Sequence, residues 1–164
     1  MTRLVLTVFC FVAVLAVVCS AGTPDQNKAL IGKFVEIGNS RDLDRLPEVV
    51  VDDFERHCQA TPGLVIDTLD KFRKFMEADV KVCPDSQVEV QQMVAEDDRV
   101  AIWATYTGTQ TGVMGPFPPS GKTMVLDFGA IFRLEDGKIA ELWVVWDNMA
   151  ALTQLGHFPP KAAK

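Results

Sequence analysis

Asp147 is the residue whose position in the sequence best suits acid or base chemistry. It ends the apolar run from Leu142 to Trp146, so its carboxyl group would lie at the edge of hydrophobic surroundings. Desolvation can raise the pKa of such a carboxyl group and make it a competent general acid or base. Asp147 or Asn148 could instead cap a helix that begins at Met149. The spacing slightly favours the cap and leaves both roles open.

Three further polar residues could hold a small molecule. His57, one of two histidines, could orient or protonate a carbonyl group, although a structural histidine between a short helix and a loop is the favoured interpretation. Tyr106 and Gln110 share one face of a predicted strand and are either hydrogen-bond donors in a pocket or ordinary sheet residues. The second histidine, His157, is close to the chain end, and we expect it to be solvated.

Neither a metal site nor a nucleotide site is indicated. The histidines and cysteines after residue 22 lack the short repeated spacings of zinc ligands. Gly121-Lys122-Thr123 is similar to part of a phosphate-binding loop, but five residues separate Gly115 from Gly121, whereas that motif needs four. Pro116, Pro118 and Pro119 also lack the N–H groups that would bind phosphate. We predict a rigid crossover loop here.

Residues 1–21 are predicted to be a secretory signal peptide. Arg3 precedes an apolar run from Leu4 to Val18, and small residues follow at Cys19-Ser20-Ala21. The run is shorter than the roughly 20 residues of a membrane-spanning helix, so no stable transmembrane segment is expected after processing. Two alternatives stay open: an uncleaved N-terminal anchor, and a lipoprotein acylated at Cys19. The protein is therefore expected to be exported, either to a periplasm or to the medium.

The chain after the signal is acidic and suits a single domain. The full sequence carries 16 basic and 22 acidic residues, and a negative surface repels the phosphates of nucleic acids, so no nucleic-acid partner is expected. Of the four cysteines, only Cys58 and Cys83 remain after processing. Outside the cytoplasm they could form a disulfide, and two buried free thiols are the alternative.

Helical spacing predicts three helices in the first half of this domain. Thr23-Pro24-Asp25-Gln26 has a capping residue followed by proline at the first helical position, and Gly38-Asn39 should stop that helix. A shorter helix is expected from Asp42 to Val50. A third helix should begin at Asp67 and bury four apolar residues: Leu69, Phe72, Phe75 and Met76.

Alternating apolar and polar residues predict four strands after Pro84. They lie around Val88-Val90 and over three longer ranges, 100–111, 123–134 and 138–146, with Asp136-Gly137 as the hairpin turn between the last two. A short helix, Met149 to Gln154, should follow. Helices first and an antiparallel meander afterwards indicate the α+β class. We expect a curved sheet whose apolar face is covered by the helices, with a cavity between them.

Several of these segments, taken in order, resemble the SnoaL-like polyketide (ester) cyclases. They are Asp53 to His57, Gly108 to Gly112, Pro118 to Lys122, Phe132-Arg133, Asp136 to Trp143, Trp146 to Asn148 and Gln154 to Gly156. The resemblance spans roughly residues 27–156. The family commonly has a histidine in the Gly-Thr-x-x-Gly segment, where this chain has Thr109-Gln110-Thr111.

The resemblance implies a cone-shaped nuclear transport factor 2-like fold and a homodimer. It also implies an enzyme that uses neither metal nor organic cofactor and closes a ring by intramolecular aldol or related cyclase, lyase or isomerase chemistry. Asp147 is similar in position to the family's general acid/base, and His57, Gln110, Tyr106 and Trp143 are the expected substrate-binding residues. The expected domains are the signal peptide at 1–21, the cyclase domain at 22–156 and a short tail at 157–164. A binding module that uses the same cavity without chemistry is the alternative.

Overall fold

The computed structural model describes residues 22–159. The predicted signal peptide, with Cys19, and residues 160–164 of the predicted tail lie outside this range. No helix within residues 22–159 has the length and apolar character needed to cross a membrane.

The first helix, α1 (Pro24–Ser40), begins as the sequence predicts. The Thr23 side chain accepts a hydrogen bond from the backbone N–H of Gln26, and the Gln26 side chain accepts one from the N–H of Thr23. This reciprocal pair satisfies two N–H groups that the helix itself cannot bond. The helix ends at Arg41, which has a left-handed backbone (φ 62°).

The segment after α1 differs from the prediction. A 3-10 helix, η1 (Leu43–Glu48), replaces the expected helix 42–50, and the chain then enters a strand, β1 (Val50–His57). The spacing of Leu43, Leu46 and Val50 fits a helix, but Pro47 lies inside η1 and the valines that follow favour a strand. His57 is consequently the last residue of a strand and does not lie at a helix-to-loop junction.

The rest of the chain follows the predicted order. The helix α2 (Leu69–Val82) precedes four strands, β2 (Gln87–Glu96), β3 (Arg99–Thr109), β4 (Thr123–Glu135) and β5 (Lys138–Trp146), and α3 (Asn148–Leu155) closes the described chain. The sheet order is β1-β5-β4-β3-β2. The four predicted strands pair antiparallel, whereas β1 adds to β5 in parallel. The α+β class is therefore confirmed, and the sheet has one strand more than predicted.

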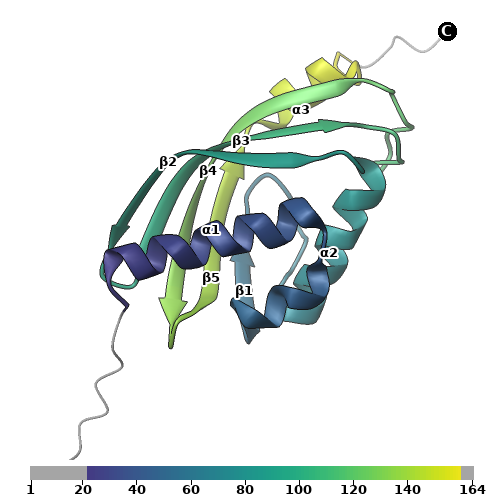
Figure 1. Ribbon diagram of the computed structural model, residues 1–164. Coiled ribbons are helices and arrows are strands. Elements are labelled where there is room, and N and C mark those ends of the chain that lie inside the picture. Colours follow the sequence, from purple (N-terminus) through teal and green to yellow (C-terminus); the bar gives the residue numbers. More distant parts are fainter. Residues whose placement is uncertain (1–21, 160–164) are drawn as a thin grey trace, which may run out of the picture.

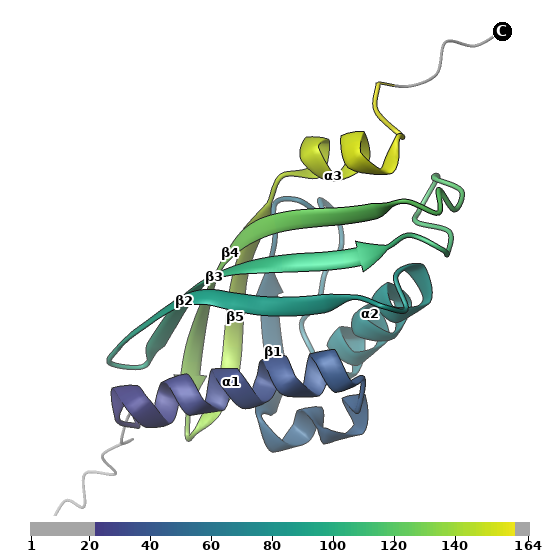
Figure 2. The same cartoon turned by 45° about the horizontal axis from the view of Figure 1, so that its top comes forward.

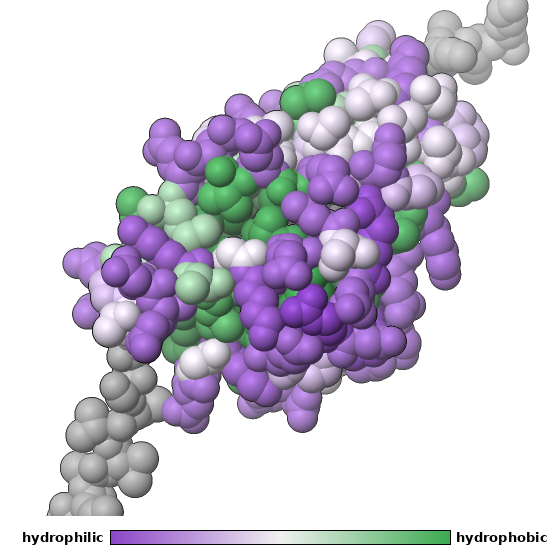
Figure 3. All heavy atoms as spheres, viewed as in Figure 1, coloured by the Kyte–Doolittle hydropathy of each residue, from purple (hydrophilic) through white to green (hydrophobic). Residues whose placement is uncertain are grey.

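The sheet curves around α1 and α2, which lie on one side of it (Figures 1 and 2). We call the face toward these helices the inner face. Its residues on β4 are those that the alternation predicts, Met124 to Leu134 at every second position, and all but Phe128 are buried. The side of the molecule seen in Figure 3 is hydrophilic over much of its area, with hydrophobic residues in its middle.

Two buried clusters fill the inner face. The larger one joins α1, α2 and β1 to the sheet and includes Phe54, Phe72 and Phe132. The Phe34 ring packs with Phe72 and Phe132, and the Phe72 ring also packs with Phe54. The smaller one lies under α3 and contains Cys83, Met124, Leu126, Ala151 and Leu155. The helix α3 thus covers one end of the sheet, while α1 and α2 cover most of the remainder.

Candidate functional site

Between the two buried clusters, the inner face is incompletely covered. Tyr106 on β3, Phe128 on β4, and Val144 and Trp146 on β5 all point inward, yet each is only half-buried. Phe128 and Trp146 are direct cross-strand partners, as are Ala130 and Val144. We call these four residues, Tyr106, Phe128, Val144 and Trp146, the inner-face site. They offer an apolar surface with one phenol group.

Asp147 lies at the border of this site, at the end of β5. It is the N-cap of α3, and its Oδ1 atom accepts hydrogen bonds from the backbone N–H groups of Met149 (2.8 Å) and Ala150 (3.0 Å). The predicted capping role is thus confirmed. Both bonds go to Oδ1, and Oδ2 accepts none from the described residues. The side chain is exposed rather than enclosed by apolar neighbours.

Two hydrogen bonds fix the chain around Asp147. The indole Nε1 of Trp146 donates to Oδ1 of Asn148 (2.8 Å), and Nδ2 of Asn148 donates to the carbonyl oxygen of Ala60 (2.6 Å). Ala60 belongs to the loop between β1 and α2. The loop is therefore tied to the end of β5, and the residues on both sides of Asp147 have defined positions.

Arg56 on β1 is a site residue that the sequence pattern did not single out. Its side chain points inward and is 7% exposed, with the guanidinium carbon 4.5 Å from the centre of the Phe75 ring and 5.7 Å from that of Trp146. Nη1 donates to Oγ1 of Thr61 (3.2 Å). Burial lowers the pKa of Arg56, and the nearby Cys58 thiol opposes that shift. Arginine nevertheless remains charged in proteins.

Tyr106 donates its hydroxyl proton to Asp79 of α2, with O–O distances of 3.2 and 3.3 Å. Burial raises the pKa of Asp79, and the hydrogen bond from Tyr106 counteracts only part of that shift. Burial and the charge of Asp79 together raise the pKa of Tyr106, so its phenol stays protonated. Cys83 is buried beside them, and burial raises its thiol pKa. The structure has Cys58 and Cys83 as free thiols, of which Cys83 is buried as the second predicted alternative has it, whereas Cys58 is half-buried.

The Gln110 side chain is fully buried and makes two hydrogen bonds within the β3–β4 connection and a third to His157 after α3. Its Nε2 donates to the carbonyl oxygens of Gly112 (3.2 Å) and Pro118 (3.1 Å), and its Oε1 lies 2.7 Å from Nε2 of His157. The prediction that His157 is solvated is wrong, because this ring is half-buried and stacks on Phe117. Gln110 and His157 together anchor the crossover loop to the end of α3.

His57 and Trp143 lie on the opposite side of the sheet, the outer face. They are partners across β1 and β5, and their rings stack with centroids 5.0 Å apart. Nε2 of His57 lies 3.2 Å from Glu141, and the other oxygen of Glu141 binds Arg133 (2.6 Å). The sheet therefore separates His57 and Trp143 from Tyr106, and the predicted substrate-binding residues are not brought together.

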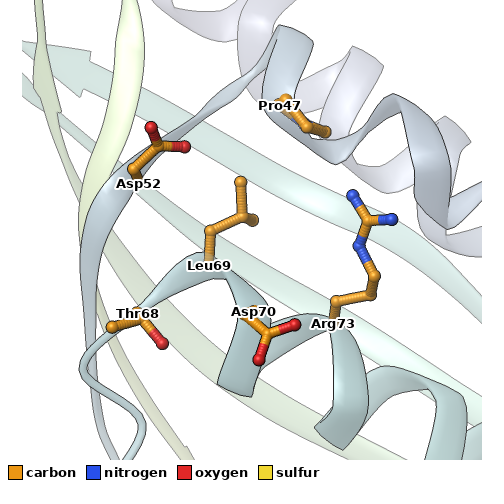
Figure 4. A pocket seen from close by; sticks show the side chains of 6 residues that line it. All are labelled: Pro47, Asp52, Thr68, Leu69, Asp70 and Arg73. Atoms are coloured by element: carbon orange, nitrogen blue, oxygen red, sulfur yellow. The ribbon is translucent and has the colours of Figure 1, made fainter.

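An open pocket lies at another place, between η1, β1 and α2. It is lined by Pro47, Asp52, Thr68, Leu69, Asp70 and Arg73 (Figure 4). Two of its three charged groups already have partners, since Arg73 binds Asp44 (2.6 Å) and Asp70 binds Lys74 (2.7 Å). None of the predicted site residues lines this pocket, and we assign it no function.

The signal that could have revealed Arg56 is strand periodicity. Once Val50 to His57 is assigned as a strand, Phe54 and Arg56 fall on one face and Glu55 and His57 on the other. An arginine on the same face as a buried phenylalanine would then have been conspicuous. Asp79 gives a weaker signal, because only the packing of α2 against β3 brings it to Tyr106.

The family profile for SnoaL-like polyketide cyclases matches residues 28–155 of this chain. Two solved structures are similar to it over most of their length. AclR, a proposed hydroxylase from Streptomyces galilaeus, is 30% identical with a TM-score of 0.73, covering 84% of this chain and 85% of AclR. IdmH, a proposed polyketide cyclase from Streptomyces antibioticus, is 29% identical with a TM-score of 0.71, covering 80% of this chain and 99% of IdmH.

A third structure is similar in fold alone. A proposed SnoaL-like polyketide cyclase from Jannaschia sp. CCS1 is 23% identical with a TM-score of 0.74, and the match covers 83% of this chain and 95% of that protein. A comparison with curated proteins found no match. The family profile begins within α1 and extends to the end of α3.

Proposed function

The chain belongs to the SnoaL-like polyketide cyclase family, and we propose that it catalyses acid/base chemistry without a cofactor on a small, largely apolar carbonyl compound. The proposed reaction is an intramolecular aldol-type ring closure or a related rearrangement of an enolisable compound. The proposed place is the inner-face site, with Asp147 as the general base. Family membership supports the prediction of an enzyme, and the similar position of Asp147 to the family's general acid/base supports its assignment as the base.

The Oδ2 atom of Asp147, which accepts no hydrogen bond from α3, carries this proposal. A capping carboxylate whose two oxygens were both bound by α3 could not approach a substrate. Here Oδ1 alone accepts both backbone N–H groups, so Oδ2 is available for a proton while Oδ1 holds the carboxylate in place. Capping and catalysis, which the sequence presents as alternatives, are compatible in this geometry.

The residues present suit each proton transfer of an aldol closure. Asp147 would take the proton from a C–H group that lies beside a carbonyl, leaving an enolate. The enolate carbon would attack a second carbonyl carbon of the same molecule, forming one C–C bond and an alkoxide. The alkoxide would then recover the proton from Asp147, so that no atom is gained or lost. Tyr106 supplies a neutral donor, and Phe128, Val144 and Trp146 supply apolar walls.

Replacing Asp147 by asparagine tests the proposal selectively. Asparagine caps helices as well as aspartate does, so Asp147→Asn should keep α3 while removing the base. Asp147→Ala should remove both and cost about 1 kcal/mol of stability as well. Full activity of Asp147→Asn on an identified substrate would exclude the assigned base. A ligand that copurifies and stays unchanged during long incubation would instead favour the binding-module alternative.

We further propose that the protein is exported and forms a homodimer. Export is supported by the arrangement of Arg3, the apolar run and the small residues before Gly22, with acylation at Cys19 as the alternative form of processing. A dimer is supported by the outer face, where Trp103, Ile131 and Val145 are 49%, 45% and 57% exposed on three neighbouring strands. Adjacent exposed apolar residues of this size are typical of an interaction surface.

A further inference from the structure

We infer that Arg56 binds a planar oxyanion of the substrate, either a carboxylate or an enolate. This inference rests on the proposed function, since it specifies the class of compound that the same site accepts. It makes Arg56 a residue that determines specificity. The expected substrates are then acidic carbonyl compounds rather than neutral ketones or esters.

Arg56 is a buried cation with no carboxylate beside it, and the Cys58 thiol is the one ionisable group that raises its pKa. Among the described residues, three polar or charged side chains are buried, Asn27, Arg56 and Gln110, and Arg56 is the one that carries a charge. No carboxylate of the described chain lies within ion-pair distance of it. A buried charge is costly unless it is paired. An anionic ligand would supply the missing partner.

Four of the other described arginines show the contrast. Arg45, Arg73, Arg99 and Arg133 all have a carboxylate within ion-pair distance, and all are more exposed than Arg56. The fifth, Arg41, donates to two backbone carbonyl oxygens instead. The chain thus places carboxylates beside arginines at its surface, where ion pairs contribute little. It places none beside the buried Arg56, where a carboxylate would contribute most.

The surroundings of Arg56 have a shape that suits a flat anion. The Phe75 and Trp146 rings lie 4.5 and 5.7 Å from the guanidinium carbon, and such contacts offset part of the desolvation cost of the cation. Nη1 is engaged by Thr61 and the Cys58 side chain is a second partner, which leaves other N–H groups of the five for a ligand. A guanidinium group matches planar oxyanions through two parallel hydrogen bonds. The two aromatic rings beside it favour a flat, conjugated partner.

Arg56 also lies near the proposed base. Trp146, which Arg56 contacts, directly precedes Asp147, and Asn148 ties the same strand end to the loop after β1. Arg56 and Asp147 therefore lie at the same end of the sheet. Negative charge that develops on a carbonyl oxygen as Asp147 removes a proton would be stabilised by a fixed cation on that side.

The test compares three small probes by isothermal titration calorimetry on the mature protein: 1-naphthoate (a carboxylate), indane-1,3-dione at a pH where it is ionised (an enolate), and 1-naphthamide (neutral). The wild type should bind at least one anion about tenfold more tightly than the amide, which is the effect of one charged hydrogen bond. Arg56→Gln should bind that anion as weakly as the amide. The anion whose affinity is lower in Arg56→Gln than in the wild type shows whether the site binds a carboxylate or an enolate.

Two further variants separate the position of the charge from the geometry of the guanidinium group. Arg133→Gln removes the same charge from the outer face and should leave anion binding unchanged. Arg56→Lys keeps the charge but loses the two parallel N–H donors of the guanidinium group, and it should bind the anion with intermediate affinity. The Tm of Arg56→Gln should equal or exceed that of the wild type, because an unpaired buried charge is removed, whereas a purely structural role would lower the Tm and leave the preference for the anion intact.

Equal binding of all three probes by the wild type, or an unchanged preference for the anion in Arg56→Gln, would overturn the inference. If Arg56→Gln does not fold, Arg56→Lys provides the test, because unchanged anion binding in that variant would also overturn the inference. The result is separable from the proposed function. Binding needs no turnover, so a loss of anion binding in Arg56→Gln supports the role of Arg56 even if Asp147 proves not to be the base. Equally, unchanged anion binding in Arg56→Gln would leave the role of Asp147 as the base untouched.

Discussion

The hydroxyl group of Tyr106 lies 3.2 Å from Oδ2 of Asp79 and connects β3 to α2 across the inner face. Burial raises the pKa of both groups. The phenol is therefore a neutral donor at all physiological pH values, and the aspartate holds its proton more tightly than an exposed one. This pair forms the polar part of the inner-face site, at the end of the sheet that also carries Asp147.

Removing the Tyr106 hydroxyl should destabilise the protein. In Tyr106→Phe the buried Asp79 carboxyl group loses its donor, which we expect to cost about 1–2 kcal/mol at neutral pH. Urea unfolding monitored by tryptophan fluorescence would measure the loss. Asp127→Asn, which affects an outer-face carboxylate bound by Thr105 (2.8 Å), should change stability much less. Unchanged stability in Tyr106→Phe would show that the pair does not form in solution.

Asp79 should make the stability of the protein depend on pH in an identifiable direction. Its folded pKa lies above the ordinary value of 3.8, so the folded state retains the proton after the unfolded chain has lost it. Wild-type stability then falls as the pH rises from about 3.8 through the folded pKa. The stability of Asp79→Asn should not fall in this pH range, because asparagine does not titrate. The two proteins should be equally stable well below pH 3.8, and Asp79→Asn should be more stable at neutral pH.

Unfolding curves of both proteins at a series of pH values measure this difference directly. A stability difference that is constant across the series would mean that the pKa of Asp79 is not raised in the folded state. A difference that changes in the opposite direction would mean that the hydrogen bond from Tyr106 outweighs the effect of burial.

The outer face should control the oligomeric state. Trp103→Glu places a charge in the middle of the exposed apolar residues and should convert the proposed dimer into a monomer, because burying that charge is costly. Light scattering after gel filtration measures the mass. Val65→Glu changes a residue that is 66% exposed in the loop before α2 and should remain dimeric. A monomeric wild type at micromolar concentration would exclude the dimer.

Processing at the N-terminus is tested by the mass of the mature protein. Cleavage after Ala21 should leave a chain that begins at Gly22, whereas acylation would leave one that begins at lipid-modified Cys19. Intact-protein mass spectrometry of the soluble and membrane fractions distinguishes the two. An intact Met1 in the soluble fraction would contradict export by this route.

Much of the fold could be predicted from local patterns. The cap at Thr23, the alternation along β4 and the Asp136-Gly137 turn each depend on neighbouring residues alone, and the structure confirms all three. The strand β1 was missed because it pairs with β5, about 90 residues later in the sequence. Its inner and outer faces differ little in composition, since Arg56 and His57 are both basic, so periodicity gave no clear signal.

The candidate site was less predictable, because its members meet only through tertiary packing. The position of Asp147 at the end of β5 and its capping role follow from the sequence. The separation of His57 from Tyr106 does not, because it depends on which face β1 turns toward the helices. The pairing of Gln110 with His157 joins residues 47 positions apart, and no local pattern marks it.

The role of Asp147 as a base is tested most directly by the rate at which the protein exchanges an acidic C–H proton. Deuterium uptake by methyl benzoylacetate at its activated carbon, followed by NMR in D2O, requires only the first step of the proposed chemistry. We predict exchange above the buffer rate with the wild type and with Asp127→Asn, and an acceleration at least about a hundredfold smaller with Asp147→Asn. Equal rates for the wild type and Asp147→Asn would contradict the assignment.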